Sequence, residues 1–393
     1  MKPALLFYCQ HSLGLGHLVR SWAIADALSS DFHVVFVSGG QPPAGLTPPA
    51  GIEMVMLPPL EQTVAGAIVT ADAQASVPDI LQRRAELLFH TYSRTAPAVV
   101  LTELFPFGRA KFANEILPVL AYAVSGRRRP LVVCSLRDLL AGGRRNQREH
   151  DERAKHLAET YFDAILVHAD PRLATLEETF KPHAPLRVPV IYTGFVSPAS
   201  PVLRAPNLDR HQVLVSAGGG RVGGPLFEAS IEAHSLTPPA ERLPMRIVTG
   251  PFLSDAEYGE LTTRAEAFGD LLVERSVPTL RPLLEMAAVS VSQCGYNTAL
   301  DLLQTRVPAL VVPFAEGRED EQRARAVRLQ ALGALRVLDP AALTGARLAA
   351  EIAATRAFTP APIALDMDGA AETRRAITRL FEAKTAPNGC VHA

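Results

Sequence analysis

The fold of this chain is decided by one stretch near its N-terminus, Leu5-Leu6-Phe7-Tyr8-Cys9-Gln10-His11-Ser12-Leu13-Gly14-Leu15-Gly16-His17-Leu18. An apolar run leads into a Gly-x-Gly-His turn, and apolar residues then recur at helical spacing. Glycines allow a tight turn and the close approach of a ligand, and the helix that follows presents its backbone amides. The stretch predicts a strand, a glycine turn and a helix, with His17 facing a ligand at the carboxyl end of a parallel strand.

The same turn does not fit a dinucleotide-binding fingerprint. That motif requires a third glycine at position 19, where this chain has Val19. We therefore expect Gly14, Gly16 and Arg20 to form a loop on the acceptor side of a site, with His17 as its chemically active residue.

Composition limits the class of protein. The chain has 393 residues, 48% of them hydrophobic and 20% charged, which leaves room for two domains. Its formal net charge of −1 argues against a nucleic-acid-binding protein. We expect a cytoplasmic protein, because no apolar run reaches the roughly 20 residues of a membrane span and a strand starts almost at once. The four cysteines are far apart and predict buried thiols, neither disulfides nor zinc ligands.

Apolar strand-like runs alternate with helix-length segments along the whole chain, which is typical of parallel sheets covered by helices. A segment with three prolines, 197–206, interrupts the pattern, and the pattern then restarts. We predict two doubly wound, Rossmann-like α/β domains that face each other across a cleft. The first spans 1–200 and the second 201–365, and in 366–393 a helix is expected to pack back on the first domain.

A glycine loop opens the second domain. After the apolar run that ends at Ser216, residues Gly218, Gly219 and Gly220 precede a helix. The spacing also fits Gly-x-Gly-x-x-Gly, but no acid ends the next apolar run, so a nest for a diphosphate is favoured over a dinucleotide site. A tight turn without a ligand is the alternative.

Two further segments place polar residues at predicted strand ends. In the first, Ser292 ends an apolar run, and a glycine turn at Gly295 leads into a helix that carries Asp301. In the second, Pro313-Phe314 is followed by Glu321 and Gln322. Carboxylate and amide oxygens suit the vicinal hydroxyl groups of a ribose or a sugar. Each residue alone would be interpreted as a solvated helix residue, but together they predict a nucleotide-sugar site.

These motifs resemble the GT-B glycosyltransferases, and family 28 in particular. In that family an acid six residues after a turn glycine holds the nucleotide ribose, a spacing matched by Gly295 and Asp301. The resemblance implies that Gln322, with Glu321, contacts the donor sugar, and that the loop around Val277 contacts the base. The donor-binding candidates are therefore Ser216, Gly218, Gly219, Gly220, Val277, Ser292, Gly295, Asn297, Thr298, Asp301, Glu321 and Gln322.

The resemblance implies an inverting, metal-independent hexosyltransferase that uses a nucleotide-diphosphate sugar, with UDP as the expected nucleotide and no cofactor. A base must then take the proton of the acceptor hydroxyl. His17 is one candidate, with an unperturbed pKa near 6.5. Glu103 is a second, as base or as the residue that orients His17, and Asp138 is a third, because each follows a predicted strand.

Two other functions remain open at this point: a nucleotide-sugar 2-epimerase of the same fold, and a non-catalytic nucleotide-sugar-binding subunit. The acceptor is also open among a small molecule, a lipid-linked molecule and a polymer, and so is the oligomeric state. Arginine runs at 127–129 and 144–148 fit an anionic acceptor or peripheral membrane contact, although such runs are usually solvated.

Overall fold

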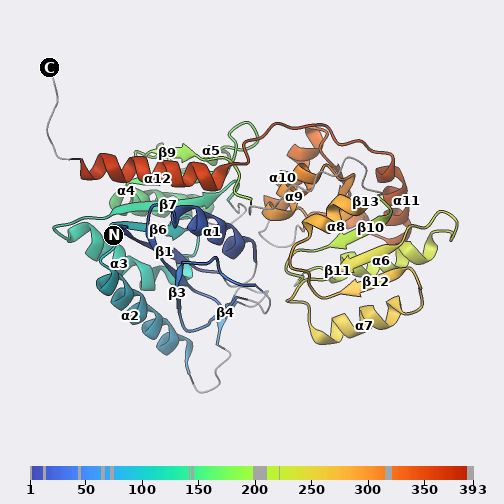
Figure 1. Cartoon of the computed structure of the whole chain (residues 1–393), viewed down its shortest axis with the longest axis horizontal. Coiled ribbons are helices and arrows are strands. Elements are labelled where there is room, and N and C mark those ends of the chain that lie inside the picture. Colours follow the sequence, from blue (N-terminus) through green and yellow to red (C-terminus); the bar gives the residue numbers. More distant parts are fainter. Residues whose placement is uncertain are drawn as a thin grey trace.

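The computed structural model describes residues 2–11, 15–42, 46–62, 67–70, 75–140, 142, 146–197, 210–220, 222–314 and 321–386. These residues form two parallel sheets, one in each half of the chain, and each sheet is flanked by helices (Figure 1). The predicted fold class, two doubly wound α/β units, is confirmed.

The first sheet has seven strands in the order β3-β2-β1-β6-β7-β8-β9, all parallel. The order reverses between β1 and β6, the switch point beside which doubly wound sheets bind ligands. The strands are β1 (Ala4–Cys9), β2 (His33–Ser38), β3 (Glu53–Met56), β6 (Val99–Glu103), β7 (Leu131–Arg137), β8 (Ala164–His168) and β9 (Val190–Tyr192).

Five helices and one 3-10 turn connect these strands, and a short antiparallel pair, β4 (Glu61–Gln62) and β5 (Ile68–Val69), stands apart from the sheet. The helices are α1 (Leu15–Leu28), α2 (Val77–Thr95), α3 (Ala113–Ser125), α4 (Gln147–Tyr161) and α5 (Leu176–Thr179), and the 3-10 turn is η1 (Ala110–Phe112).

The second sheet has six parallel strands in the order β12-β11-β10-β13-β14-β15, with the reversal between β10 and β13. Its strands are β10 (Gln212–Ser216), β11 (Met245–Val248), β12 (Leu271–Glu274), β13 (Ala287–Ser292), β14 (Ala309–Val311) and β15 (Arg336–Val337). Its helices are α6 (Gly224–Leu236), α7 (Asp255–Ala265), α8 (Arg281–Met286), α9 (Tyr296–Thr305), α10 (Glu321–Ala331) and α11 (Gly345–Arg356), with a 3-10 turn η2 (Pro340–Ala342).

Burial explains why strand β1 is apolar throughout. Leu6 and Tyr8 belong to the hydrophobic cluster on one face of the sheet, whereas Leu5, Phe7 and Cys9 belong to the cluster on the other. Alternate side chains of a strand point to opposite faces, and both faces are covered here. All five side chains are inaccessible to solvent. The continuous apolar run was therefore a sound signal for a parallel strand.

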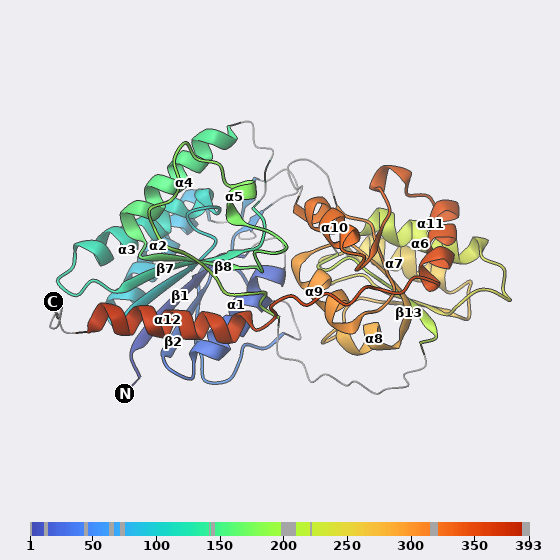
Figure 2. The same cartoon turned by 90° about the horizontal axis from the view of Figure 1, so that it is seen from above.

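The last helix, α12 (Gly369–Thr385), returns to the first domain and lies against α1 (Figure 2). Phe381 packs edge-on against Phe32, with ring centroids 5.8 Å apart. Arg374 donates a 2.9 Å hydrogen bond to Asp31, and Lys384 bonds to Asp163 at 2.7 Å. The chain thus crosses between the two halves twice, at the proline-rich segment and before α12.

Several details differ from the sequence-based expectation. Strand β9 was not predicted, since Val190–Tyr192 is too short to show a clear pattern. The expected linker lies outside the described residues from 198 onward. Cys9, Cys134 and Cys294 are buried and free, as expected, whereas Cys390 lies outside the described residues. Among the described helices, none is long and apolar enough to span a membrane.

Candidate active site

The two catalytic candidates at the switch point of the first sheet lie side by side. Glu103 is the last residue of β6, and His17 is in the first turn of α1, directly after β1. Because β1 and β6 are neighbours in the sheet, their carboxyl ends bring the two side chains together. The Nδ1 atom of His17 is 2.6 Å from Oε1 of Glu103.

The partners of Glu103 fix the tautomer of His17. Arg20, one turn further along α1, donates from Nη2 to the same Oε1 at 2.5 Å. An ionised carboxylate can only accept, so the proton of this contact belongs to His17 Nδ1. The Nε2 atom of His17 is then the unprotonated nitrogen. His17 is 17% exposed, whereas Glu103 is fully buried.

Electrostatics keeps Glu103 ionised and His17 neutral. Burial alone would raise the pKa of Glu103, but His17 together with the guanidinium groups of Arg20 and Arg109 holds it well below its usual value. The pKa of His17 is lowered from 6.5 to about 4: burial is the main cause, Glu103 opposes the shift, and Arg109 adds to it. At neutral pH the pair is therefore a neutral imidazole hydrogen-bonded to an ionised carboxylate.

Asp138, the third catalytic candidate, has another role in the structure. It is 1% exposed, and both carboxylate oxygens accept hydrogen bonds from Arg325, at 2.7 and 2.8 Å. Burial opposes its ionisation, but Arg325 keeps its pKa below the usual value. Both oxygens are occupied by the guanidinium group, so we assign Asp138 to an ion pair between the domains and not to proton transfer.

In the second domain, the glycine loop after β10 has the geometry of a tight turn. Gly218 has φ +57° and Gly220 has φ +88°, values that favour glycine. A Cβ on Gly220 would lie 2.1 Å from the carbonyl oxygen of Thr249, so the loop packs directly on the backbone after β11. A Cβ on Gly218 would meet no described atom within 4 Å, which leaves space beside the loop.

Helix α9 begins close to the glycine turn of the first domain, at Gly16. Gly295 is its N-cap, and no acidic side chain occupies its first turn. A Cβ on Gly16 would be 3.7 Å from Nδ2 of Asn297, so the turn that carries His17 lies against the start of α9. The Oδ1 atom of Asn297 is buried without a partner among the described residues. Thr298, also in the first turn, is partly exposed.

Asp301 lies one turn further along α9 and is mostly buried. Among the described residues, none donates a hydrogen bond to its carboxylate, although Arg281 exerts some attraction. Burial raises its pKa from 3.8 to about 6. A buried carboxylate without hydrogen-bond donors is stabilised when a ligand donates hydrogen bonds to it.

The structure separates the two neighbours Glu321 and Gln322. Gln322 accepts hydrogen bonds at Oε1 from the backbone amides of Cys294 and Phe314, at 3.1 and 3.2 Å, so its Nε2 group is directed elsewhere. Glu321 instead forms an ion pair with Arg137 across the domain boundary. Gln322 therefore keeps its Nε2 group for a ligand, and Oε2 of Glu321 is buried without a hydrogen-bond partner among the described residues.

The remaining predicted residues lie elsewhere in the two domains or outside the described part. Ser216 and Ser292 end β10 and β13, and both are buried. Val277 is partly buried in the loop after β12. Gly14 lies outside the described residues, and so do Arg144 and Arg145. Arg127 and Arg128 are exposed, as expected for a solvated run.

The expectation that the chain needs no metal overlooked one feature of the sequence, the triplet Asp366-Met367-Asp368. Two acids at this spacing resemble a metal-binding pair. In the structure Asp366 accepts a hydrogen bond from the amide of Asp368 at 3.0 Å, and its own amide donates to Asp170. The triplet thus belongs to the crossing before α12.

Sequence reasoning missed the residues that connect the two domains. Tyr296 is 6% exposed, and its hydroxyl donates to the carbonyl of His168 and accepts from the amide of Val196, both at 2.9 Å. The guanidinium carbons of Arg20 and Arg325 lie 5.3 and 5.9 Å from the centre of its ring. Only the position of Tyr296, beside the turn glycine, could have drawn attention to it.

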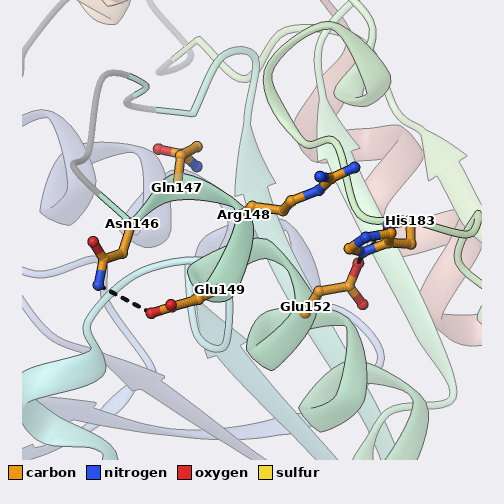
Figure 3. A pocket seen from close by; sticks show the side chains of 6 residues that line it. All are labelled: Asn146, Gln147, Arg148, Glu149, Glu152 and His183. Carbon is orange, nitrogen blue, oxygen red and sulfur yellow. Dashed lines mark hydrogen bonds and ion pairs between the residues drawn. The ribbon is translucent and has the colours of Figure 1, made fainter.

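A surface hollow of about 410 Å³ lies elsewhere, at the start of α4 (Figure 3). Its lining is mixed in charge, and Glu152 is directed at His183, 2.6 Å away. None of the candidate site residues lines it. The hollow is therefore separate from the candidate site described above.

Comparison with known proteins agrees with the geometry. Residues 276–379 match the model of the glycosyltransferase family 28 C-terminal domain. This range contains α9, Asp301 and Gln322. No curated protein matches the sequence of the chain.

Solved structures resemble the whole chain. The calicheamicin glycosyltransferase CalG4 has a TM-score of 0.60 at 18% identity, over 98% of this chain and 100% of that one. The spinosyn forosaminyltransferase SpnP has a TM-score of 0.59 at 18% identity, over 97% and 95%. MurG from Acinetobacter baumannii has a TM-score of 0.56 at 14% identity, over 97% and 99%. The chain is thus a glycosyltransferase of the GT-B fold, and its residues 276–379 match the family 28 C-terminal domain.

Proposed function

We propose that the chain transfers a sugar from a nucleotide-diphosphate sugar, with UDP as the expected nucleotide, to an acceptor hydroxyl with inversion at the anomeric carbon. The observation that supports this proposal most strongly is that His17, the partner of Glu103, follows Gly16, which lies against Asn297 at the start of α9. Displacement of a diphosphate from a sugar requires a base for the acceptor hydroxyl and a group, such as a helix N-terminus, that stabilises the diphosphate.

The donor would bind to the second domain. Asp301 accepts hydrogen bonds from the two ribose hydroxyls, and Nε2 of Gln322 donates to the sugar. The amides at the start of α9 and in the loop at Gly218 face the diphosphate, where they stabilise the charge that develops on the leaving group. These groups supply that stabilisation without a metal ion.

The acceptor would bind to the first domain, beside His17. Nε2 of His17 takes the proton of the acceptor hydroxyl while that oxygen attacks the anomeric carbon, and the bond from this carbon to the diphosphate breaks. The imidazolium that forms is stabilised by the carboxylate of Glu103. Attack from the side opposite the leaving group gives inversion.

The experiment that tests this function is the release of nucleotide from a panel of nucleotide sugars, with and without added acceptor alcohols. We expect release to depend on one nucleotide and to rise with acceptor. Conversion of UDP-N-acetylglucosamine to its 2-epimer without acceptor would instead favour the epimerase. Binding of nucleotide without turnover under any condition would favour the non-catalytic subunit.

A further inference from the structure

Arg20 contacts both the catalytic pair and the second domain. The side chain is 1% exposed, and its Nη2 atom is 2.5 Å from Oε1 of Glu103. Its guanidinium carbon lies 5.3 Å from the centre of the Tyr296 ring, within the range of a cation–π interaction. Arg20 therefore lies between the carboxylate that orients His17 and the first residue of α9.

Tyr296 is itself held in a fixed place. Its hydroxyl bonds to the backbone of His168 and of Val196, where the chain leaves the first domain. On the same ring lies Arg325, which is bound twice to Asp138. The ring thus belongs to α9, and its contacts lie where the two domains meet.

Glu103 is held unevenly by its cations. Arg20 and His17 share Oε1, whereas Arg109 lies 3.9 Å from Oε2, too far for a hydrogen bond. The Oε2 atom has no hydrogen-bond partner among the described residues. Apart from His17 itself, Arg20 is thus the described side chain that fixes the direction of this carboxylate.

We propose that Arg20 is a positioning residue that couples the docking of α9 to the orientation of the Glu103–His17 pair. When Tyr296 and Arg20 are in contact, Glu103 is held toward Nδ1 of His17, and Nε2 is directed into the cleft as a base. Displacement of α9 removes the support of Arg20 and misaligns the base. The inference rests on the proposed function, since it gives His17 the role of base.

The test needs no substrate. In the full chain with labelled histidine, the Nδ1 proton of His17 gives a deshielded NMR resonance that the variant His17→Gln identifies. We expect Arg20→Gln to abolish this resonance or shift it strongly upfield. Arg109→Gln is the matched control, because it removes the same charge beside Glu103 but has no contact with Tyr296, and it should keep the resonance.

A pair of variants at Tyr296 tests the coupling. Tyr296→Phe and Tyr296→Leu both lose the hydroxyl, but only Tyr296→Leu loses the ring. We expect the His17 resonance to be weaker in Tyr296→Leu than in Tyr296→Phe, and this difference to disappear when Arg20→Gln is also present. Should Tyr296→Leu not fold, the comparison of Arg20→Gln with Arg109→Gln still decides the positioning role.

An unchanged His17 resonance in Arg20→Gln would overturn the inference, and so would equal spectra of the two Tyr296 variants. On nucleotide-sugar turnover, Arg20→Gln should lower kcat by about 10²-fold with donor KM unchanged, as expected for a misplaced base. If none of the tested nucleotides binds, the proposed function is contradicted, but the NMR result on Arg20 still holds.

Discussion

Asp138 and Arg325, 187 residues apart in the sequence, form a doubly hydrogen-bonded ion pair across the boundary between the two domains. Both side chains are almost fully buried. Arg325 also donates a 2.7 Å hydrogen bond to the carbonyl of Cys294, just before α9. The pair therefore holds the start of α9 against the first domain.

The first prediction concerns this pair. Arg325→Leu leaves the Asp138 carboxylate buried without its partner, which should lower the free energy of unfolding by about 3–5 kcal/mol. Chemical denaturation measures the change. Arg328→Gln is the control, because Arg328 pairs with the more exposed Glu178, and a pair of this kind contributes only about 0–1 kcal/mol. Equal losses in the two variants would contradict the assigned role.

The second prediction is that Asp301 lowers the stability of the folded chain but strengthens nucleotide binding. Its pKa is about 6 in the folded chain and 3.8 ordinarily, so the folded state holds the proton more tightly. Protonation of Asp301 therefore stabilises the folded state, and this contribution is fully present below pH 3.8. It is lost as the pH rises through 6. At pH 7.5 the buried Asp301 carboxylate is ionised and opposes folding. Asp301→Asn should therefore raise the melting temperature of the unliganded chain at pH 7.5.

The same variant should bind nucleotide more weakly. Nucleotide affinity of the natural chain should also fall as pH drops below 6, because protonation removes the acceptor for the ribose hydroxyls. Asp301→Asn should lose this pH dependence. Calorimetric titrations between pH 5 and pH 8 measure both effects, and an identical pH dependence in the two proteins would exclude Asp301 as the titrating group.

The third prediction concerns His17 as the base. His17→Gln should lower turnover by on the order of 10²–10⁴-fold, with little change in donor affinity. Because the base must be unprotonated, turnover of the natural chain should fall as pH drops through about 4, the pKa that burial gives His17. Initial rates of nucleotide release across this pH range check the prediction.

The exposed His183, which lies by the hollow at α4, provides the control for the third prediction. His183→Gln should keep the rate and the pH profile of the natural chain. At saturating donor, an acidic limit near pH 4 that persists in His17→Gln would show that a group other than His17 titrates there.

The sequence predicted the fold well because both sheets are parallel and covered. Such strands are continuous apolar runs, as in Ala4–Cys9, and the turns that follow them carry glycine. The position of His17 beside Glu103 followed from the same rule, since both come after strands at a switch point.

Contacts between the domains could not be predicted in this way. The pairing of Asp138 with Arg325, and the place of Arg20 against Tyr296, depend on how two separately folded units dock. No periodicity in the sequence encodes that docking, so Asp138 was grouped with the catalytic residues by its position after a strand alone. The ion pair of Glu321 with Arg137 could not be predicted for the same reason, because Arg137 lies in the other domain.

The central claim is that the cleft holds a nucleotide-diphosphate sugar with its ribose on Asp301. Titration of the chain with UDP, TDP and GDP, followed by calorimetry, tests it most directly, with Asp301→Ala beside Glu260→Ala as a control on the exposed face of α7. We predict that one nucleotide, UDP in the first place, binds the natural chain and Glu260→Ala equally. Loss of bonds to two ribose hydroxyls should weaken its binding to Asp301→Ala by about ten- to a hundredfold. Equal affinity in Asp301→Ala, or no binding of any of the three nucleotides, would contradict the account.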